Sequence, residues 1–201
     1  MASVKISPDE LISAPLKTGR LPLRPPLRED APAIGELVGD PDVMRFLGAQ
    51  TVPPEHVGAV VAKWLRRWEA NGVGPFVIER RRDRRFLGRA GIILWDVRTW
   101  RETTLDEAGG HAQPELGWAL VRAEWGHGYA TEAARAVRYW ARRQRSIDHL
   151  VSLIAPDNTA SQRVARRLGA SPGETVSLFD SGDAVVWEHP TVSFEDHRGS
   201  T

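Results

Sequence analysis

Two glycines stand directly before a helical pattern in residues 125–130, which read WGHGYA. Small and apolar residues then recur at the spacing of one helix face, at Ala130, Ala133, Ala134, Val137, Trp140 and Ala141. The first amides of a helix have no partner within it, and the helix dipole makes this end attractive to anions. Glycines also let a ligand come close to the backbone. The pattern predicts an anion site suited to a pyrophosphate, although an ordinary tight turn explains the two glycines alone equally well.

Two other glycine motifs fit this segment poorly. A Walker loop needs a lysine after its last glycine, but the three lysines of the chain are Lys5, Lys17 and Lys63. The dinucleotide fingerprint needs a third glycine or an alanine at Thr131, and residues 122–124 separate the preceding apolar run from Gly126. The spacing therefore disfavours nucleotide hydrolysis and NAD binding.

The composition sets bounds on the class of protein. A chain of 201 residues, 41% of them hydrophobic, suits one domain with a substantial core. No window approaches the roughly 18 apolar residues of a membrane span, and the N-terminus lacks the apolar stretch of a signal peptide. We therefore expect a cytoplasmic protein without membrane contact. The absence of cysteine excludes disulfides and a cysteine acyl-enzyme, and the histidines lack ligand spacing, so we expect no metal.

One basic run interrupts a nearly balanced charge of +1, at residues 80–85, which read RRRDRR. Such a run is a candidate nucleic-acid patch. It lies between two apolar runs, residues 76–78 and 86–95, so the simpler interpretation is the solvated turn of a hairpin. We do not expect nucleic-acid binding, and contact with an acidic partner is the remaining alternative.

Apolar periodicity predicts the elements that must position the glycine turn. We expect helices over residues 30–38 and 57–71, a third helix from the glycine turn, and a fourth that begins after Asp157 or Asn158 and ends at Gly169. We expect strands over residues 21–24, 75–80, 87–95, 115–121, 150–155, 174–179 and 184–188. Pro22 cannot donate to a ladder, which predicts an edge position for the first strand. Residues 97–111 are either a flap over substrate or disordered padding.

Four segments, in this order, resemble the GNAT N-acetyltransferases and specifically their RimJ/RimL branch. They are residues 18–25 (TGRLPLRP), 115–120 (ELGWAL), 125–134 (WGHGYATEAA) and 158–169 (NTASQRVARRLG). The resemblance implies an α/β fold with a twisted mixed sheet and helices on both faces. It places one domain over residues 18–190, between tails at residues 1–17 and 191–201. The implied reaction is direct transfer of an acetyl group from acetyl-CoA to a primary amine.

The resemblance leaves several points open. The acceptor is a protein N-terminal amine or a small-molecule amine, and the donor can carry another acyl group such as succinyl. A catalytically silent acyl-CoA-binding regulatory module and a nucleic-acid-associated protein are the other classes, and a homodimer is left open as the assembly.

In this family the glycine turn is written Gln/Arg-x-x-Gly-x-Gly/Ala and its amides bind the pyrophosphate of acetyl-CoA. Trp125 stands where glutamine or arginine is usual, and Asn158 is implied to contact the pantetheine arm. The residues that the resemblance assigns to acetyl-CoA are Ala119, Leu120, Val121, Trp125, Gly126, His127, Gly128, Tyr129, Ala130, Thr131 and Asn158.

Two residues are candidates for catalysis. Glu115 is implied to take the proton of the attacking amine, directly or through a water, and apolar neighbours would raise its pKa; a solvated strand residue is the alternative. Many relatives have an acid tyrosine at the position of Ala165, whereas the RimL pattern places Ser161 near the thiol sulfur. The alternative for Ser161 is an ordinary third helical residue, and that for Asn158 is a cap. Residues 42–47 and the loop after Trp95 are implied to contact the acceptor.

Overall fold

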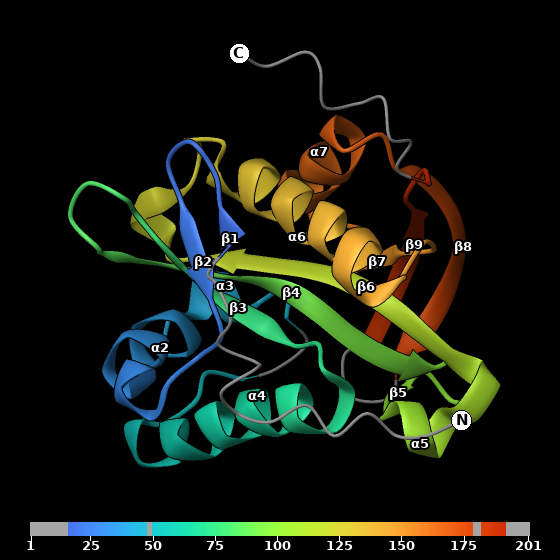
Figure 1. Ribbon diagram of the computed structural model, residues 1–201, viewed down its shortest axis with the longest axis horizontal. Coiled ribbons are helices and arrows are strands. Elements are labelled where there is room, and N and C mark those ends of the chain that lie inside the picture. The colour runs from blue at the N-terminus through green and yellow to red at the C-terminus, as the bar shows by residue number, and fades with distance from the viewer. Residues whose placement is uncertain (1–15, 48–49, 179–181, 192–201) are drawn as a thin grey trace.

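The computed structural model describes residues 16–47, 50–178 and 182–191. A twisted mixed sheet forms its centre, in the order β1-β2-β3-β4-β6-β7-β9-β8, with β5 paired to β4 (Figure 1). The strands are β1 (Leu16–Lys17), β2 (Pro22–Arg24), β3 (Pro75–Glu79), β4 (Phe86–Asp96), β5 (Arg101–Glu102), β6 (Ala112–Leu120), β7 (Val151–Ile154), β8 (Ser171–Leu178) and β9 (Gly182–Glu188). Neighbouring strands are antiparallel except β6 and β7, which are parallel.

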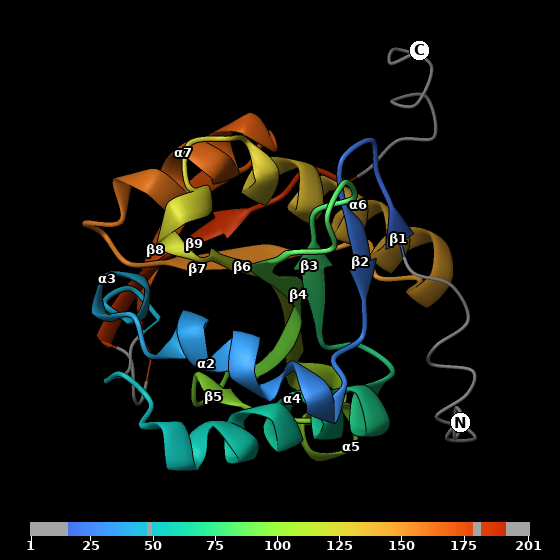
Figure 2. The ribbon, with the colours of Figure 1, turned by 90° about the vertical axis from the view of Figure 1, so that its left-hand side faces the viewer.

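Helices cover both faces of this sheet, as Figure 2 shows. They are α2 (Ala31–Val38), α3 (Pro41–Met44), α4 (Val57–Asn71), α5 (Leu105–Ala108), α6 (Tyr129–Arg145) and α7 (Thr159–Arg167). Alternate side chains of the strands point to opposite faces, which divides the core in two. One cluster joins β4 and β6 to Val137 and Trp140 of α6, and the other joins α2 to Val61 and Trp64 of α4. The expected mixed α/β fold is confirmed.

Most predicted elements are present close to the expected bounds. The helices over residues 30–38 and 57–71 are α2 and α4, and Gly72 ends α4 with a φ of 62°. The basic run at residues 80–85 forms the turn between β3 and β4, so the hairpin interpretation is confirmed. Phe179, at the end of a predicted strand, lies outside the described residues. No helix in the described ranges is long and apolar enough to cross a membrane.

Two predictions need correction. The strand β2 is not the edge, because Leu16 and Lys17, at the end of the segment predicted as a tail, pair outside it as β1. Residues 97–111 are not disordered padding, since they contain β5 and α5. The carboxylate of Glu102 in this segment binds Arg67 on α4 at 2.6 and 2.7 Å, and Leu105 N–H donates to Asn71 Oδ1 at 3.0 Å. Long-range ion pairs of this kind leave no local pattern in a sequence.

Candidate active site

The strands β6 and β7 separate next to Glu115. They form one register pair, Glu115 with Val151, whereas β4 and β6 pair continuously from Gly88 with Leu120 to Asp96 with Ala112. A cavity of about 340 Å³ lies where the two parallel strands diverge. It is lined by residues 115–120 of β6, residues 152–154 of β7, the glycine turn, the first turn of α6, one side of α7 as far as Arg167, and residues of and after α3. The divergence therefore supplies a site that a continuous sheet would close.

The glycine turn opens onto this cavity. Gly126 and Gly128 have φ values of +81° and +79°, a region that side chains other than glycine rarely adopt. The first bond within α6 runs from Glu132 N–H to the Gly128 carbonyl, which leaves the amides of residues 129–131 without a helical partner. A Cβ added at Gly126 would meet no atom of the described residues within 4 Å. The hydroxyl of Thr131 is buried and has no hydrogen-bond partner among the described residues. Open space, free amides and an unpaired hydroxyl suit an anionic ligand.

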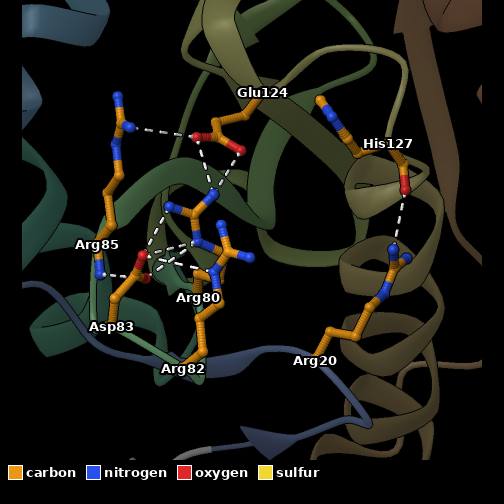
Figure 3. Close-up of polar contacts among 7 residues, drawn as sticks. All are labelled: Arg20, Arg80, Arg82, Asp83, Arg85, Glu124 and His127. Atoms are coloured by element: carbon orange, nitrogen blue, oxygen red, sulfur yellow. Dashed lines mark hydrogen bonds and ion pairs between the residues drawn. The ribbon is translucent and has the colours of Figure 1, made fainter.

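Ion pairs hold the segment that leads into the turn (Figure 3). Glu124, in the 3₁₀ turn Arg122–Glu124, accepts hydrogen bonds at 3.2 Å from Arg80 Nη1, and Arg80 also binds Asp83 at 2.7 Å. The sequence predicted a solvated turn. The Arg80 side chain is only 13% exposed, so the basic turn is solvated only in part. From the other side, Arg20 Nη1 donates to the His127 carbonyl at 3.0 Å. Two arginines distant in the sequence thus fix the turn from both ends.

The predicted acetyl-CoA residues fall into two groups. Nine of them line the cavity: Ala119, Leu120, Trp125, Gly126, Gly128, Tyr129, Ala130, Thr131 and Asn158. Val121 and His127 lie outside its lining. Val121 packs in the cluster of α2 and α4, and its N–H donates to the Leu87 carbonyl at 2.9 Å. The His127 ring stacks on Tyr129 with ring centres 5.6 Å apart. Val121 faces α2 and α4 because successive residues along a strand alternate between the faces of the sheet. His127 points outward from the turn. A linear motif reveals neither direction.

Glu115 is buried, so it is not the solvated strand residue of the alternative interpretation. Trp95 Nε1 donates to its Oε2 at 2.6 Å. Burial raises the pKa of this carboxyl, while Trp95, the positive charge of Arg89 and the backbone N–H of Leu153 favour the ionised form. A raised pKa brings a carboxyl closer to the range in which a base works near neutral pH.

Asn158 and Ser161 lie together at the start of α7. Asn158 Oδ1 accepts the Ser161 N–H at 3.0 Å, so the cap predicted as one alternative is confirmed. Both residues also line the cavity. The cap involves the backbone amide of Ser161 and not its side-chain hydroxyl. Ala165, where many relatives have tyrosine, is fully buried.

Comparison with known proteins identifies the family. Residues 20–171 match the acetyltransferase (GNAT) domain model. The protein YkkB of Bacillus subtilis (strain 168) is 31% identical over 159 residues, which cover 79% of this chain and 85% of YkkB. The chain belongs to the GNAT acetyltransferase family. It is an acetyl-CoA-dependent N-acetyltransferase, and the free amides of its turn and the Thr131 hydroxyl fit the phosphates of that donor.

Solved structures agree with this fold. An acetyltransferase of Agrobacterium tumefaciens str. C58 superposes with a TM-score of 0.70 at 29% identity, covering 87% of this chain and 93% of its own. RimL, described as a ribosomal L7/L12 alpha-N-protein acetyltransferase in complex with coenzyme A, has a TM-score of 0.69 over 87% of this chain and 96% of its own. At 17% identity, the likeness to RimL shows the fold alone.

The GNAT cavity also contains residues that the sequence did not single out. Arg89 of β4 lines it and was detectable as a charged residue within the apolar run at residues 86–95. Ser152 lines it too, donating to the Leu116 carbonyl at 2.6 Å and contacting His189 Nε2 at 2.9 Å. Burial lowers the pKa of His189 to about 4, and Arg138 adds to the shift, so this histidine is neutral near pH 7. Nothing in the local sequence indicated this pair.

The predicted acceptor segments have different positions. Asp42, Val43, Phe46 and Leu47 line the cavity, whereas no residue of 97–111 does. In the described part of the chain, no group of three or more His, Asp or Glu side chains is placed to hold a metal ion.

Proposed function

We propose that this GNAT protein moves an acetyl group from acetyl-CoA directly to a primary amine while both are bound, with Glu115 as the base and Ser161 beside the leaving thiolate. One observation carries the proposal: the glycine turn, Ser161 and Glu115 all line a single cavity. A donor held at the turn and an amine beside Glu115 would therefore share one enclosed space. Proximity of this kind removes much of the entropic barrier to a bimolecular reaction.

The proposed chemistry gives each of the two polar groups one task, proton acceptance for Glu115 and a hydrogen bond to the thiolate for Ser161. Glu115, in its ionised form, accepts a proton from the ammonium of the acceptor, directly or through a water, which leaves a lone pair on nitrogen. The nitrogen bonds to the thioester carbonyl carbon, the bond from carbon to sulfur breaks with its electron pair on sulfur, and the second proton of the nitrogen passes to the thiolate or to water. The Ser161 hydroxyl donates a hydrogen bond to the departing thiolate, and it does so weakly because a serine hydroxyl is a poor acid.

We place the protein in the RimJ/RimL branch, which implies an acceptor that is a protein N-terminal amine or a small-molecule amine. The four matching segments support this placement. Asn158 is proposed to hold the pantetheine arm in addition to capping α7.

Calorimetric titration with acetyl-CoA, succinyl-CoA and free CoA tests the donor, and thiol release against a panel of amines and peptides tests the transfer. We expect acetyl-CoA to bind and at least one amine to increase thiol release above hydrolysis. Stronger turnover with succinyl-CoA would replace the acetyl group in the proposal. Binding without turnover on every amine would favour a silent acyl-CoA module, and no binding would refute the proposal.

A further inference from the structure

Arg89 is the basic residue of the mostly buried strand β4. It lies on β4 with its guanidinium carbon 5.9 Å from the centre of the Trp64 ring of α4, and it lines the cavity. Its Nη1 atom is enclosed and has no hydrogen-bond partner within the ranges that the structure describes. Leaving a buried donor unpaired is costly, and more so when the group is charged. A ligand that supplies an oxygen would remove this cost.

Arg89 and Glu115 approach the same small space from opposite directions along the sheet. Arg89 pairs with Ala119 and Glu115 pairs with Ile93, so Gly117 stands between them on β6. A Cβ added at Gly117 would lie 3.5 Å from Arg89 Nη1 and 3.5 Å from Glu115 Oε1. The two atoms are therefore no more than twice that distance apart. Arg89 Nη1 has no hydrogen-bond partner and no ion pair with Glu115 among the described residues, and Gly117 places no side chain between them.

The charged groups around Arg89 leave its Nη1 atom without a carboxylate partner among the described residues. Arg67 and Lys63 both bind the carboxylate of Glu102, at 2.6 and 2.7 Å, so Glu102 is already shared between two cations. Glu115 is the other carboxylate that acts on Arg89. Burial lowers the pKa of Arg89 to about 10, which still leaves its guanidinium charged near pH 7. The charged groups that act on Arg89 are thus Arg67, Glu102 and Glu115, and Glu102 is held by Arg67 and Lys63, so none of these carboxylates satisfies Arg89 Nη1.

We propose that Arg89 binds a carboxylate of the acceptor, so that the acceptor is an amine that carries a carboxylate close to its nitrogen. The inference rests on the proposed function, in which Glu115 takes the proton of the same amine. In an α-amino acid one carbon separates the two groups, which lets them reach Glu115 and Arg89 together. Guanidinium and carboxylate form charge-assisted, often paired hydrogen bonds. Val43, Phe46 and Leu47 line the same cavity and suit an apolar remainder.

Such a carboxylate has two sources, a free amino acid or an acidic first residue of a peptide. We would measure kcat/KM by thiol release for leucine against leucinamide, and for the tripeptide amides Asp-Ala-Ala against Asn-Ala-Ala. The carboxylate member of at least one pair should be favoured about ten- to a hundredfold, the range for a hydrogen bond to a charged group. The pair that shows the preference identifies the source.

Variants test whether Arg89 causes that preference. Arg89→Gln should reduce it to near unity, and Arg89→Lys should keep a part of it. Arg66→Gln is the matched control, because Arg66 is exposed on α4 and the change removes the same charge. Equal kcat/KM within both wild-type pairs, or a preference that survives in Arg89→Gln, would overturn the inference and leave the proposed function intact.

A binding measurement keeps the inference testable without turnover. In the presence of CoA, calorimetry should show tighter binding of N-acetyl-leucine than of N-acetyl-leucinamide, or of the N-acetylated aspartyl peptide than of its asparaginyl counterpart. Arg89→Gln should abolish the difference. If no amine is acetylated but this difference is found, the proposed function fails and the role of Arg89 stands. If every pair binds equally, the role of Arg89 is refuted.

Discussion

Replacing Gly128 should lower the stability of the fold only slightly and the affinity for acetyl-CoA strongly, so the two effects can be measured separately. Its φ is +79°, so alanine or leucine at this position is strained by about 1–2 kcal/mol. An added Cβ would meet only Arg20 Nη2, at 3.7 Å, so no clash within the fold adds to that strain. For a domain of this size each kcal/mol lowers the Tm by about 2–4 °C. We therefore expect the Tm of either variant to fall by about 2–8 °C and the fold to persist.

The affinity for acetyl-CoA should fall much further than the stability. Gly128 lines the cavity directly before the free amides of residues 129–131, where the phosphates are expected, so we expect a side chain there to take up part of that space. Each hydrogen bond to a charged group is worth about 1.5–3 kcal/mol. The loss of one bond in Gly128→Ala would weaken Kd about tenfold or more, and Gly128→Leu should weaken it at least about a hundredfold.

Calorimetry for Kd and thermal unfolding for Tm would be measured on the same preparations. Gly182→Ala and Gly182→Leu are matched controls, because Gly182 has a φ of +74° and pairs with Leu178 outside the cavity lining. Among the described residues, no atom lies within 4 Å of a Cβ added there. Both controls should lose similar stability and no affinity. An acetyl-CoA Kd for Gly128→Leu within about twofold of wild type would refute the assignment of the turn as the phosphate site.

Three further substitutions test the remaining parts of the site. Glu115→Gln should lower kcat about a hundredfold or more, the range for a lost general base, with acetyl-CoA Kd nearly unchanged. Burial raises the pKa of Glu115, so the wild-type rate should rise with pH as the base form accumulates, and the variant should lack that rise. If Glu115→Gln kept the wild-type pH profile, Glu115 would not be the base and its role would be structural. Ser161→Ala should lower kcat only about two- to tenfold, measured by thiol release, because it removes one weak hydrogen bond; a hundredfold loss would contradict the weak role. Glu124→Gln should raise the KM for acetyl-CoA while kcat holds, since Arg80 then loses its charged partner beside the turn; unchanged KM and Tm would show that this pair positions nothing.

Two controls support these measurements. Ser161→Ala should keep its Tm, because Asn158 caps α7 through the backbone amide of residue 161 rather than through its hydroxyl. Glu115→Gln retains an oxygen that can accept from Trp95 Nε1, so its fold should also persist.

The sequence by itself determined most of the elements and predicted the anion site. Apolar periodicity placed α2, α4 and α6, and the glycines at residues 126 and 128 marked a helix start that opens onto the cavity. These features depend on neighbours a few residues apart, because helix faces, caps and positive φ angles are local properties. The fold followed from the order of four motifs along the chain.

Only the tertiary structure decided which side chains meet. It buried Glu115 beside Trp95, joined Arg80 to Glu124 and brought Arg89 to Gly117, although each pair is more than ten residues apart. It also turned His127 away from the cavity and paired β1 outside β2. Burial and charge pairing depend on distances in space, which sheet register and helix packing set and no short segment of sequence contains.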